Sequence, residues 1–126
     1  MKEFRRLTVW EKAHALTLAI YCATASFPRE EVYGITSQMR RCSASIAANI
    51  AEGCGRSGDG DFHRFLNIAA GSSFELEYFL LLSRDLNFLS SDAQLELTAA
   101  AREVQRMLAS LLRRVERSRA GAVANR

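Results

Sequence analysis

Apolar residues recur at intervals of three and four positions along most of the chain, which is the period of one face of an α-helix. The first such run predicts a helix over residues 8–26, with Thr8 and Glu11 as an S/T-x-x-E capping box. After a turn around Pro28, a second run predicts a helix over about residues 36–53. Since alternating β-branched runs are few, these patterns predict an all-α protein.

Two further helices follow the only glycine-rich segment, residues 53–60. The third is predicted over about residues 62–87, with Asp59 or Asp61 as its N-cap. The fourth is predicted to begin at a second capping box, from Ser91 to Gln94, and to end near Arg117. The apolar period then stops, which predicts a flexible tail over residues 118–126.

Short connections between four helices predict an antiparallel, up-down-up-down four-helix bundle. The whole chain, residues 1–126, would form this one domain, with a core over about residues 4–117. Residues 74–82 are apolar nearly all the way round the third helix, and residues 15–26 of the first carry no charge. A lone bundle keeps one face of each helix wet, so this excess predicts a homo-oligomer.

The chemistry-bearing residues form no complete catalytic or metal site. Gly53, Gly55 and Gly58 match G-x-G-x-x-G, but that motif binds dinucleotides only between a strand and a helix. Glu11 and His14 form a single Glu-x-x-His, whereas a di-iron bundle needs two and two further glutamates. We therefore expect no enzyme, no metal and no cofactor.

Three cysteines without close pairing argue against disulfides and structural zinc, and predict reduced thiols in the cytoplasm. The first residues lack the apolar run of a signal peptide, and we expect no membrane span. The net charge is +3 and the sequence pI about 9.0, from an excess of arginine over only two lysines. This balance permits nucleic-acid binding without requiring it.

An arginine stripe on the fourth helix is the strongest candidate binding feature. At 100° per residue, its members fall within a sector of about 60°, opposite the apolar seam and without a carboxylate inside the sector. They are Arg102, Arg106, Arg113 and Arg117. Such guanidinium groups can pair with backbone phosphates of RNA or DNA. The alternative interpretation is that any outer helix face must be charged, and that cations near a helix C-terminus are mildly stabilising.

Several short motifs resemble, in their joint order, one bacterial family. They are Leu7 to Ala13 (LTVWEKA), Phe27-Pro28, Tyr33 to Arg41 (YGITSQMRR), Asn49 to Gly53 (NIAEG), Gly55-Arg56, and Gly71-Ser72 with Glu75 to Glu77. The chain is similar to the four-helix-bundle proteins encoded in intervening sequences of large-subunit rRNA genes.

The resemblance implies a cytosolic homopentamer without established catalytic residues. Similar bundles are the accessory variability determinants of retroelements, in which a basic pentamer binds nucleic acid. The motif residues that match here include Arg40, Arg41 and Arg56, which join the stripe as candidate nucleic-acid contacts. The leading hypothesis is therefore a non-enzymatic homo-oligomer that binds nucleic acid. The alternative is a scaffold whose partner is another protein.

Overall fold

The computed structural model describes residues 2–124, and every regular element in that span is helical. Four long helices follow one another, with a short 3₁₀ helix before the first and another before the second. They are η1 (Phe4–Arg6), α1 (Thr8–Thr24), η2 (Arg29–Glu31), α2 (Ile35–Cys54), α3 (Asp59–Asp85) and α4 (Ser91–Ala124). The predicted all-α, four-helix fold is confirmed.

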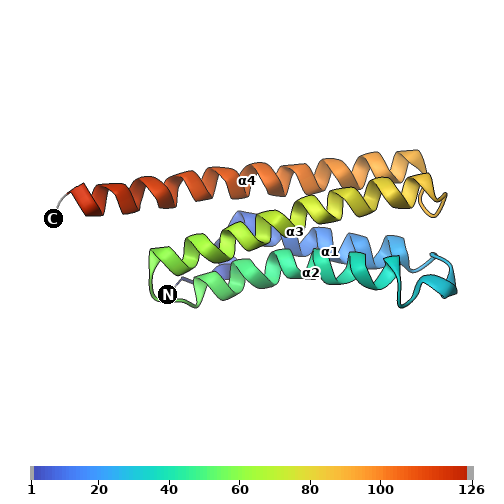
Figure 1. The fold of residues 1–126 in the computed structure, drawn as a ribbon, viewed down its shortest axis with the longest axis horizontal. Coiled ribbons are helices and arrows are strands. Elements are labelled where there is room, and N and C mark those ends of the chain that lie inside the picture. Colours follow the sequence, from blue (N-terminus) through green and yellow to red (C-terminus); the bar gives the residue numbers. More distant parts are fainter. Residues whose placement is uncertain (1, 125–126) are drawn as a thin grey trace.

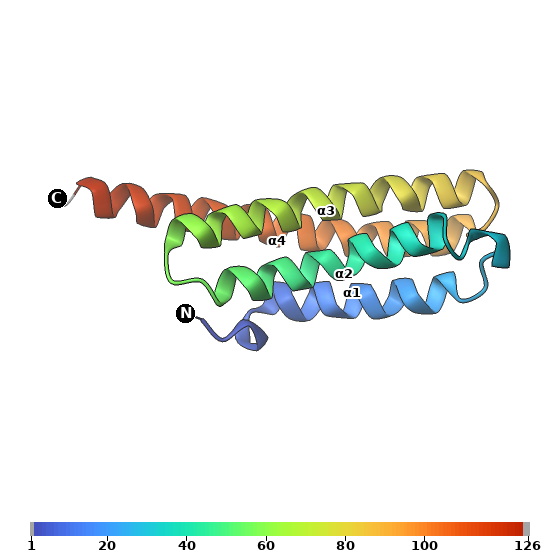
Figure 2. The ribbon, with the colours of Figure 1, turned by 60° about the horizontal axis from the view of Figure 1, so that its bottom comes forward.

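Consecutive helices run in opposite directions (Figures 1 and 2). Contacts between α3 and α4 show this directly: His63 lies against Glu116 and Glu77 against Arg102, so the partner's number falls as the α3 number rises. Each helix packs against the next, and α1 also packs against α4, which closes the bundle.

The apolar stripes predicted for the four helices meet in one core. Ile20, Met39, Ile46, Leu76 and Leu108 are each fully buried there. At Gly53 the absence of a side chain lets α2 lie close to α3, because a Cβ at this position would lie 3.0 Å from Phe65 Cβ. Because the core contacts orient each helix, they also determine which faces of α1, α3 and α4 are exposed on the surface.

The helix starts differ from the two capping boxes predicted. Thr8 is already the first residue of α1, and Leu7 is its N-cap, which has no capping side chain. At α4 the cap is Ser90, whose Oγ accepts from the Ala93 amide at 3.1 Å. The box predicted from Ser91 is therefore wrong by one position, and the Gln94 side chain instead donates to Thr98.

The third helix begins three residues before its predicted start. Its N-cap is Gly58, so Asp59 and Asp61 lie in the first turn rather than at the cap. There they complement the positive end of the helix dipole without a side-chain cap bond. The helix ends at Asp85 and is followed by a left-handed Asn87, and Phe88 N–H donates to Ser83 C=O at 2.9 Å.

The predicted end of the fourth helix near Arg117 is wrong, because α4 continues to Ala124, through most of the predicted tail. The flexibility of that tail stays a prediction. Val115 is the last buried residue of α4, and residues 116–123 are all exposed. Figure 1 shows this end of α4 projecting beyond the other three helices. Residues 125 and 126, also in the predicted tail, lie outside the described residues.

Candidate nucleic-acid interface

The seven candidate arginines fall into two groups that the sequence did not distinguish. Some are held by other parts of the bundle, and the others stand on its surface with no ion-pair partner among residues 2–124. The held residues are Arg40, Arg56 and Arg102, and the others are Arg41, Arg106, Arg113 and Arg117.

Arg40 joins α2 to the end of α1. Its Nε donates to Thr24 Oγ1 at 2.9 Å and its Nη2 to Tyr21 C=O at 3.3 Å. The guanidinium also lies 4.7 Å from the centre of the Tyr21 ring. Because the last carbonyls of a helix lack intrahelical donors, this arginine caps the C-terminus of α1.

Arg56 and Arg102 each pair with a glutamate. Arg56 Nη2 lies 2.7 Å from Glu52 Oε1, one turn earlier along the chain, and its guanidinium lies over the Phe65 ring. Arg102 Nη2 lies 3.0 Å from Glu77 Oε2 on α3. Both guanidinium groups therefore already have a carboxylate partner, although both side chains remain about half exposed.

Arg106, Arg113 and Arg117 form what we call the α4 stripe. All three are exposed, and no carboxylate in the described part of the chain lies within ion-pair distance of them. The two glutamates on this part of α4 have other partners. Glu103 pairs with Lys12 of α1 at 3.3 Å and Glu116 with His63 of α3 at 2.8 Å.

Arg41 lies apart from the stripe, on the surface between α2 and α3. It borders a shallow depression together with Ser45, Ser72 and Glu75. The two serine hydroxyls are hydrogen-bonded to each other at 2.9 Å. Arg41 and the α4 stripe therefore lie on different helix pairs.

Sequence reasoning missed two further arginines, Arg6 and Arg114. They border one groove of about 370 Å³ between the start of α1 and the second half of α4, together with Leu7 and Leu111. Position 6 and position 114 meet only because α1 packs antiparallel to α4. No local motif signals this pair, and only the overall arginine excess points to such sites.

Two of the three cysteines, Cys42 and Cys54, are buried, whereas Cys22 is exposed. Burial raises the pKa of the Cys42 thiol to about 12, and burial also raises the pKa of Cys54. The buried thiols therefore stay protonated, and a protonated thiol is a weak nucleophile. Within the described span, no three His, Cys, Asp or Glu side chains gather as a metal site would require.

Two exposed apolar surfaces lie outside the core. On α1, Leu18 is 58% and Tyr21 is 44% exposed. Between α3 and α4, Phe74, Tyr78 and Leu95 border a groove of about 480 Å³, and each is more than half exposed. All of these residues except Leu95 lie in residues 15–26 and 74–82, the two segments that the sequence predicts to be too apolar for a lone bundle.

By length and composition, α3 could cross a membrane, and it is alone in this among the residues described. An 18-residue window of α3 reaches a mean hydropathy of 1.2, with 28% of it buried. In the bundle the helix packs against both α2 and α4, and core helices of water-soluble proteins reach the same hydropathy. The absence of a membrane span stays a prediction.

Comparison with known proteins identifies the family. The profile of the 23S rRNA-intervening sequence protein matches residues 5–110, which cover all of α1, α2 and α3 and most of α4. The chain belongs to this family. The resemblance drawn from the sequence motifs is thereby confirmed.

A solved structure of the same architecture is a protein of unknown function from the S23 ribosomal protein family of Bacteroides thetaiotaomicron. It is 24% identical, with a TM-score of 0.76, and the match covers 83% of this chain and 98% of that one. At this identity the likeness supports the fold of the 23S rRNA-intervening sequence protein and no particular activity. No protein of curated function shows significant similarity.

Proposed function

We propose that this 23S rRNA-intervening sequence protein is a non-enzymatic, cytoplasmic homo-oligomer that binds RNA or DNA through arginine faces. The number of copies we propose is five, as the family resemblance implies. The single observation that carries the proposal is the α4 stripe, which has three exposed guanidinium groups and no carboxylate partner in the described residues. These groups remain available for phosphates.

The stripe has a geometry suited to a nucleic-acid backbone. Arg106 and Arg117 are eleven residue steps apart on one helix, with Arg113 between them, which is about 17 Å at 1.5 Å per residue. Phosphates along one strand are spaced by several ångströms, so two or three can be reached together. Because no base edge is involved, we expect binding that depends on salt and tolerates different sequences.

Oligomer formation would multiply the stripe. The exposed apolar residues on α1 and those in the α3–α4 groove form two separate surfaces of one copy, so one copy can offer α1 to the groove of the next. Head-to-tail contacts of this kind close into rings when the rotation between copies allows it. A ring would carry one α4 stripe for each copy, and several weak phosphate contacts would then act together.

The oligomer is tested by the solution mass of the purified chain, measured by light scattering at several concentrations. We expect about five times the 14.0 kDa of one chain. Substituting Leu18→Glu should lower that mass, because a charge would be buried at the contact. A wild-type protein that stays monomeric at all concentrations contradicts the oligomer.

Nucleic-acid binding is tested by gel shift at low salt with a mixed-sequence RNA and DNA. The test variant replaces all three arginines of the α4 stripe with glutamine. The control replaces Arg5, Arg64 and Arg84, each of which has a carboxylate partner. Both variants lose three positive charges, so binding lost only in the stripe variant supports the proposal. Equal loss in both would indicate a mere net-charge effect and would contradict the α4 site.

The alternative is a scaffold for a polypeptide partner. The observation in its favour is the α3–α4 groove, where Phe74, Tyr78 and Leu95 present aromatic and aliphatic surface of the kind that protein interfaces use. A partner protein that stays bound after nuclease treatment, and is lost on Tyr78→Glu but not in the stripe variant, would favour the scaffold.

A further inference from the structure

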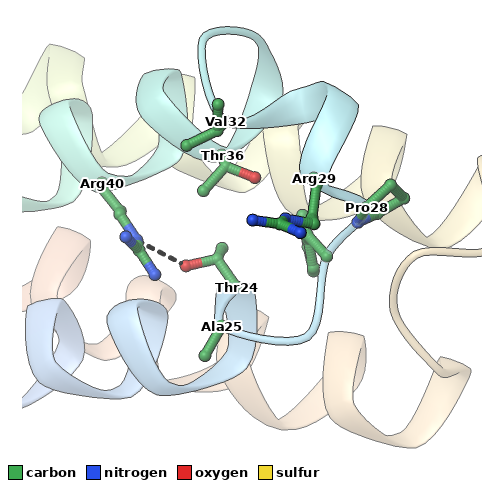
Figure 3. A pocket seen from close by; sticks show the side chains of 8 residues that line it. Thr24, Ala25, Pro28, Arg29, Val32, Thr36 and Arg40 are labelled. Atoms are coloured by element: carbon green, nitrogen blue, oxygen red, sulfur yellow. Dashed lines mark hydrogen bonds between the residues drawn. The ribbon is translucent and has the colours of Figure 1, made fainter.

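A small pocket lies where the segment after α1 folds over the start of α2 (Figure 3). Its volume is about 300 Å³. Its polar lining comes from Thr24, Arg29, Thr36 and Arg40, and its apolar lining from Ala25, Phe27, Pro28 and Val32. None of the α4 stripe takes part, so this pocket is a separate feature of the molecule.

Two guanidinium groups border the pocket from opposite sides. Figure 3 shows Arg29 beside Pro28 at one end of the pocket and Arg40 at the other end, where it bonds to Thr24. Arg29 is exposed and forms no ion pair within residues 2–124. Arg40 uses Nε and Nη2 to hold the end of α1, which leaves its Nη1 donors unused. Two positively charged side chains, each with unused N–H donors, therefore border the pocket.

The hydroxyl of Thr36 is a buried polar group without a partner. The residue is 6% exposed, and its Oγ1 has no hydrogen-bond partner. In Figure 3 this oxygen points to the side of the pocket where Arg29 stands. A buried hydroxyl left unsatisfied is destabilising, so such a group calls for an explanation.

The pocket also lies at the positive end of α2. Thr36 is the second residue of that helix, whose first amide, that of Ile35, is bonded to Glu31 Oε2 at 3.3 Å. Gly34 makes room for this carboxylate, since a Cβ there would meet Glu31 Oε2 at 2.5 Å. One carboxylate thus already serves the helix start, and the two guanidinium groups add positive charge on the pocket side.

We propose that this pocket binds a phosphoryl group, with the apolar wall accepting the organic part of a phosphomonoester. A tetrahedral phosphate can accept from Arg29, from Arg40 Nη1 and from the Thr36 hydroxyl, which come from three directions. The volume exceeds what one phosphate ion needs, and Phe27, Pro28 and Val32 offer apolar contact to the remainder. The proposal does not depend on nucleic-acid binding by α4.

The experiment titrates the full-length protein with inorganic phosphate, against chloride at equal ionic strength. We expect saturable shifts of the Thr36 amide signal in NMR spectra and a rise in melting temperature, because a ligand that binds the folded state stabilises it. Arg29→Gln should weaken phosphate binding at least tenfold. No saturable shift, or unchanged affinity in Arg29→Gln, would overturn the proposal.

Thr36→Val separates a binding role from a structural one. Valine has nearly the same shape without the hydroxyl, so removing an unpaired buried oxygen should leave the phosphate-free protein equally stable or more stable. Phosphate binding should nevertheless weaken several-fold. If the variant is less stable and binds phosphate as the wild type does, the hydroxyl has a structural role and the proposal fails.

Two sources could supply the phosphoryl group, a small metabolite or the end of a nucleic-acid strand. A short oligothymidylate with a 5′ phosphate and the same strand with a 5′ hydroxyl distinguish them. Tighter binding of the 5′-phosphorylated strand than of both the 5′-hydroxyl strand and inorganic phosphate indicates a strand end. If the two strands bind equally while inorganic phosphate still binds in the pocket, the source is a small molecule. The triple variant of the α4 stripe should keep its phosphate affinity, so failure of that stripe and failure of this pocket are separate results.

Discussion

Arginines at the corner between α1 and α2 and arginines on the outer face of α4 have the same chemistry and different surroundings. Arg40 reaches across the corner to a hydroxyl, a carbonyl and an aromatic ring of α1. Arg113 reaches none of these, and it has no ion-pair partner among the residues described. One guanidinium therefore stabilises the fold, and the other is exposed without an ion-pair partner in the described part of the chain.

The difference indicates that a guanidinium nitrogen is available for binding only where the fold does not already use it as a donor. Substituting an arginine that the fold uses should consequently lower stability more than nucleic-acid affinity, and substituting an exposed, unpaired arginine should do the reverse. Arg40 should matter most for stability, Arg102 and Arg56 less, and Arg113 least. Substitutions of Arg40, Arg56 and Arg113 test this order, and Gln105→Leu tests the Glu77 link to which Arg102 belongs. All should be compared at one protein concentration because oligomer stability depends on it.

The largest loss of stability is expected from Arg40→Gln. The substitution removes two hydrogen bonds from a charged donor and one ring contact, which together should cost about 1–3 kcal/mol. Urea unfolding followed by circular dichroism measures the loss. Gel-shift affinity should change little. A variant as stable as the wild type but unable to bind nucleic acid would reverse the assignment of Arg40.

The second effect concerns the link between Glu77, Arg102 and Gln105. Hydrogen bonds from Gln105 and then from Arg102 lower the pKa of Glu77 below its ordinary value of 4.5. A lowered carboxyl pKa contributes stability above the ordinary value, and that contribution is lost as the pH falls through the lowered pKa. The link should therefore be effective at neutral pH and absent in acid.

Gln105→Leu removes the first of these bonds, 2.9 Å long, while keeping the side-chain volume. We expect it to cost about 1 kcal/mol at pH 7. Urea unfolding at pH 7 and at a pH below the lowered pKa should show the difference from wild type shrinking in acid. Gln105 Nε2 also donates to Ser73 C=O at 3.4 Å, and this bond does not depend on pH. A difference independent of pH would therefore mean that packing or the Ser73 bond, rather than the Glu77 charge, is responsible.

The fold was largely predictable from the sequence because apolar period and short connections are local properties. The capping boxes failed for a local reason as well: Leu7 already has the extended backbone of a cap, so Thr8 enters the helix. The Arg56 pair with Glu52, four positions apart in the sequence, is also local, but the long-range contacts of the other arginines were not predictable. Arg102 meets a glutamate 25 positions away, and only helix packing decides this.

The pocket beside Thr36 was equally hidden in the sequence. Its lining spans positions 24 to 40 and forms only when η2 turns the chain back over α2. The four arginines of the predicted stripe were identified from their angular positions around the helix axis, which depend only on the backbone. The angle was right for all four, since all are exposed, but it could not reveal that Arg102 is paired.

A third, smaller effect is expected from Arg56→Gln. The pair with Glu52 is exposed and one helical turn apart, and such pairs contribute about 0.3–0.5 kcal/mol. The loss should shrink further at high salt, because surface charges are screened. Unfolding in low and high salt measures both values. A loss above 1 kcal/mol would show that the contact with the Phe65 ring matters more than the ion pair.

Arg113→Gln should have the smallest effect on stability and a clear effect on binding. With no partner to lose among the described residues, the unfolding free energy should stay within about 0.5 kcal/mol of wild type. If Arg113 contacts a phosphate, the slope of log affinity against log salt should become less steep by about 0.9 on duplex DNA. Fluorescence anisotropy with labelled DNA at several salt concentrations measures that slope. Arg5→Gln, which removes the same charge from an ion-paired site, is the control and should leave the slope unchanged. If Arg113→Gln also left the slope unchanged while the protein still bound DNA, the phosphate contacts would lie elsewhere, and the groove bordered by Arg6 and Arg114 would become the first surface to test.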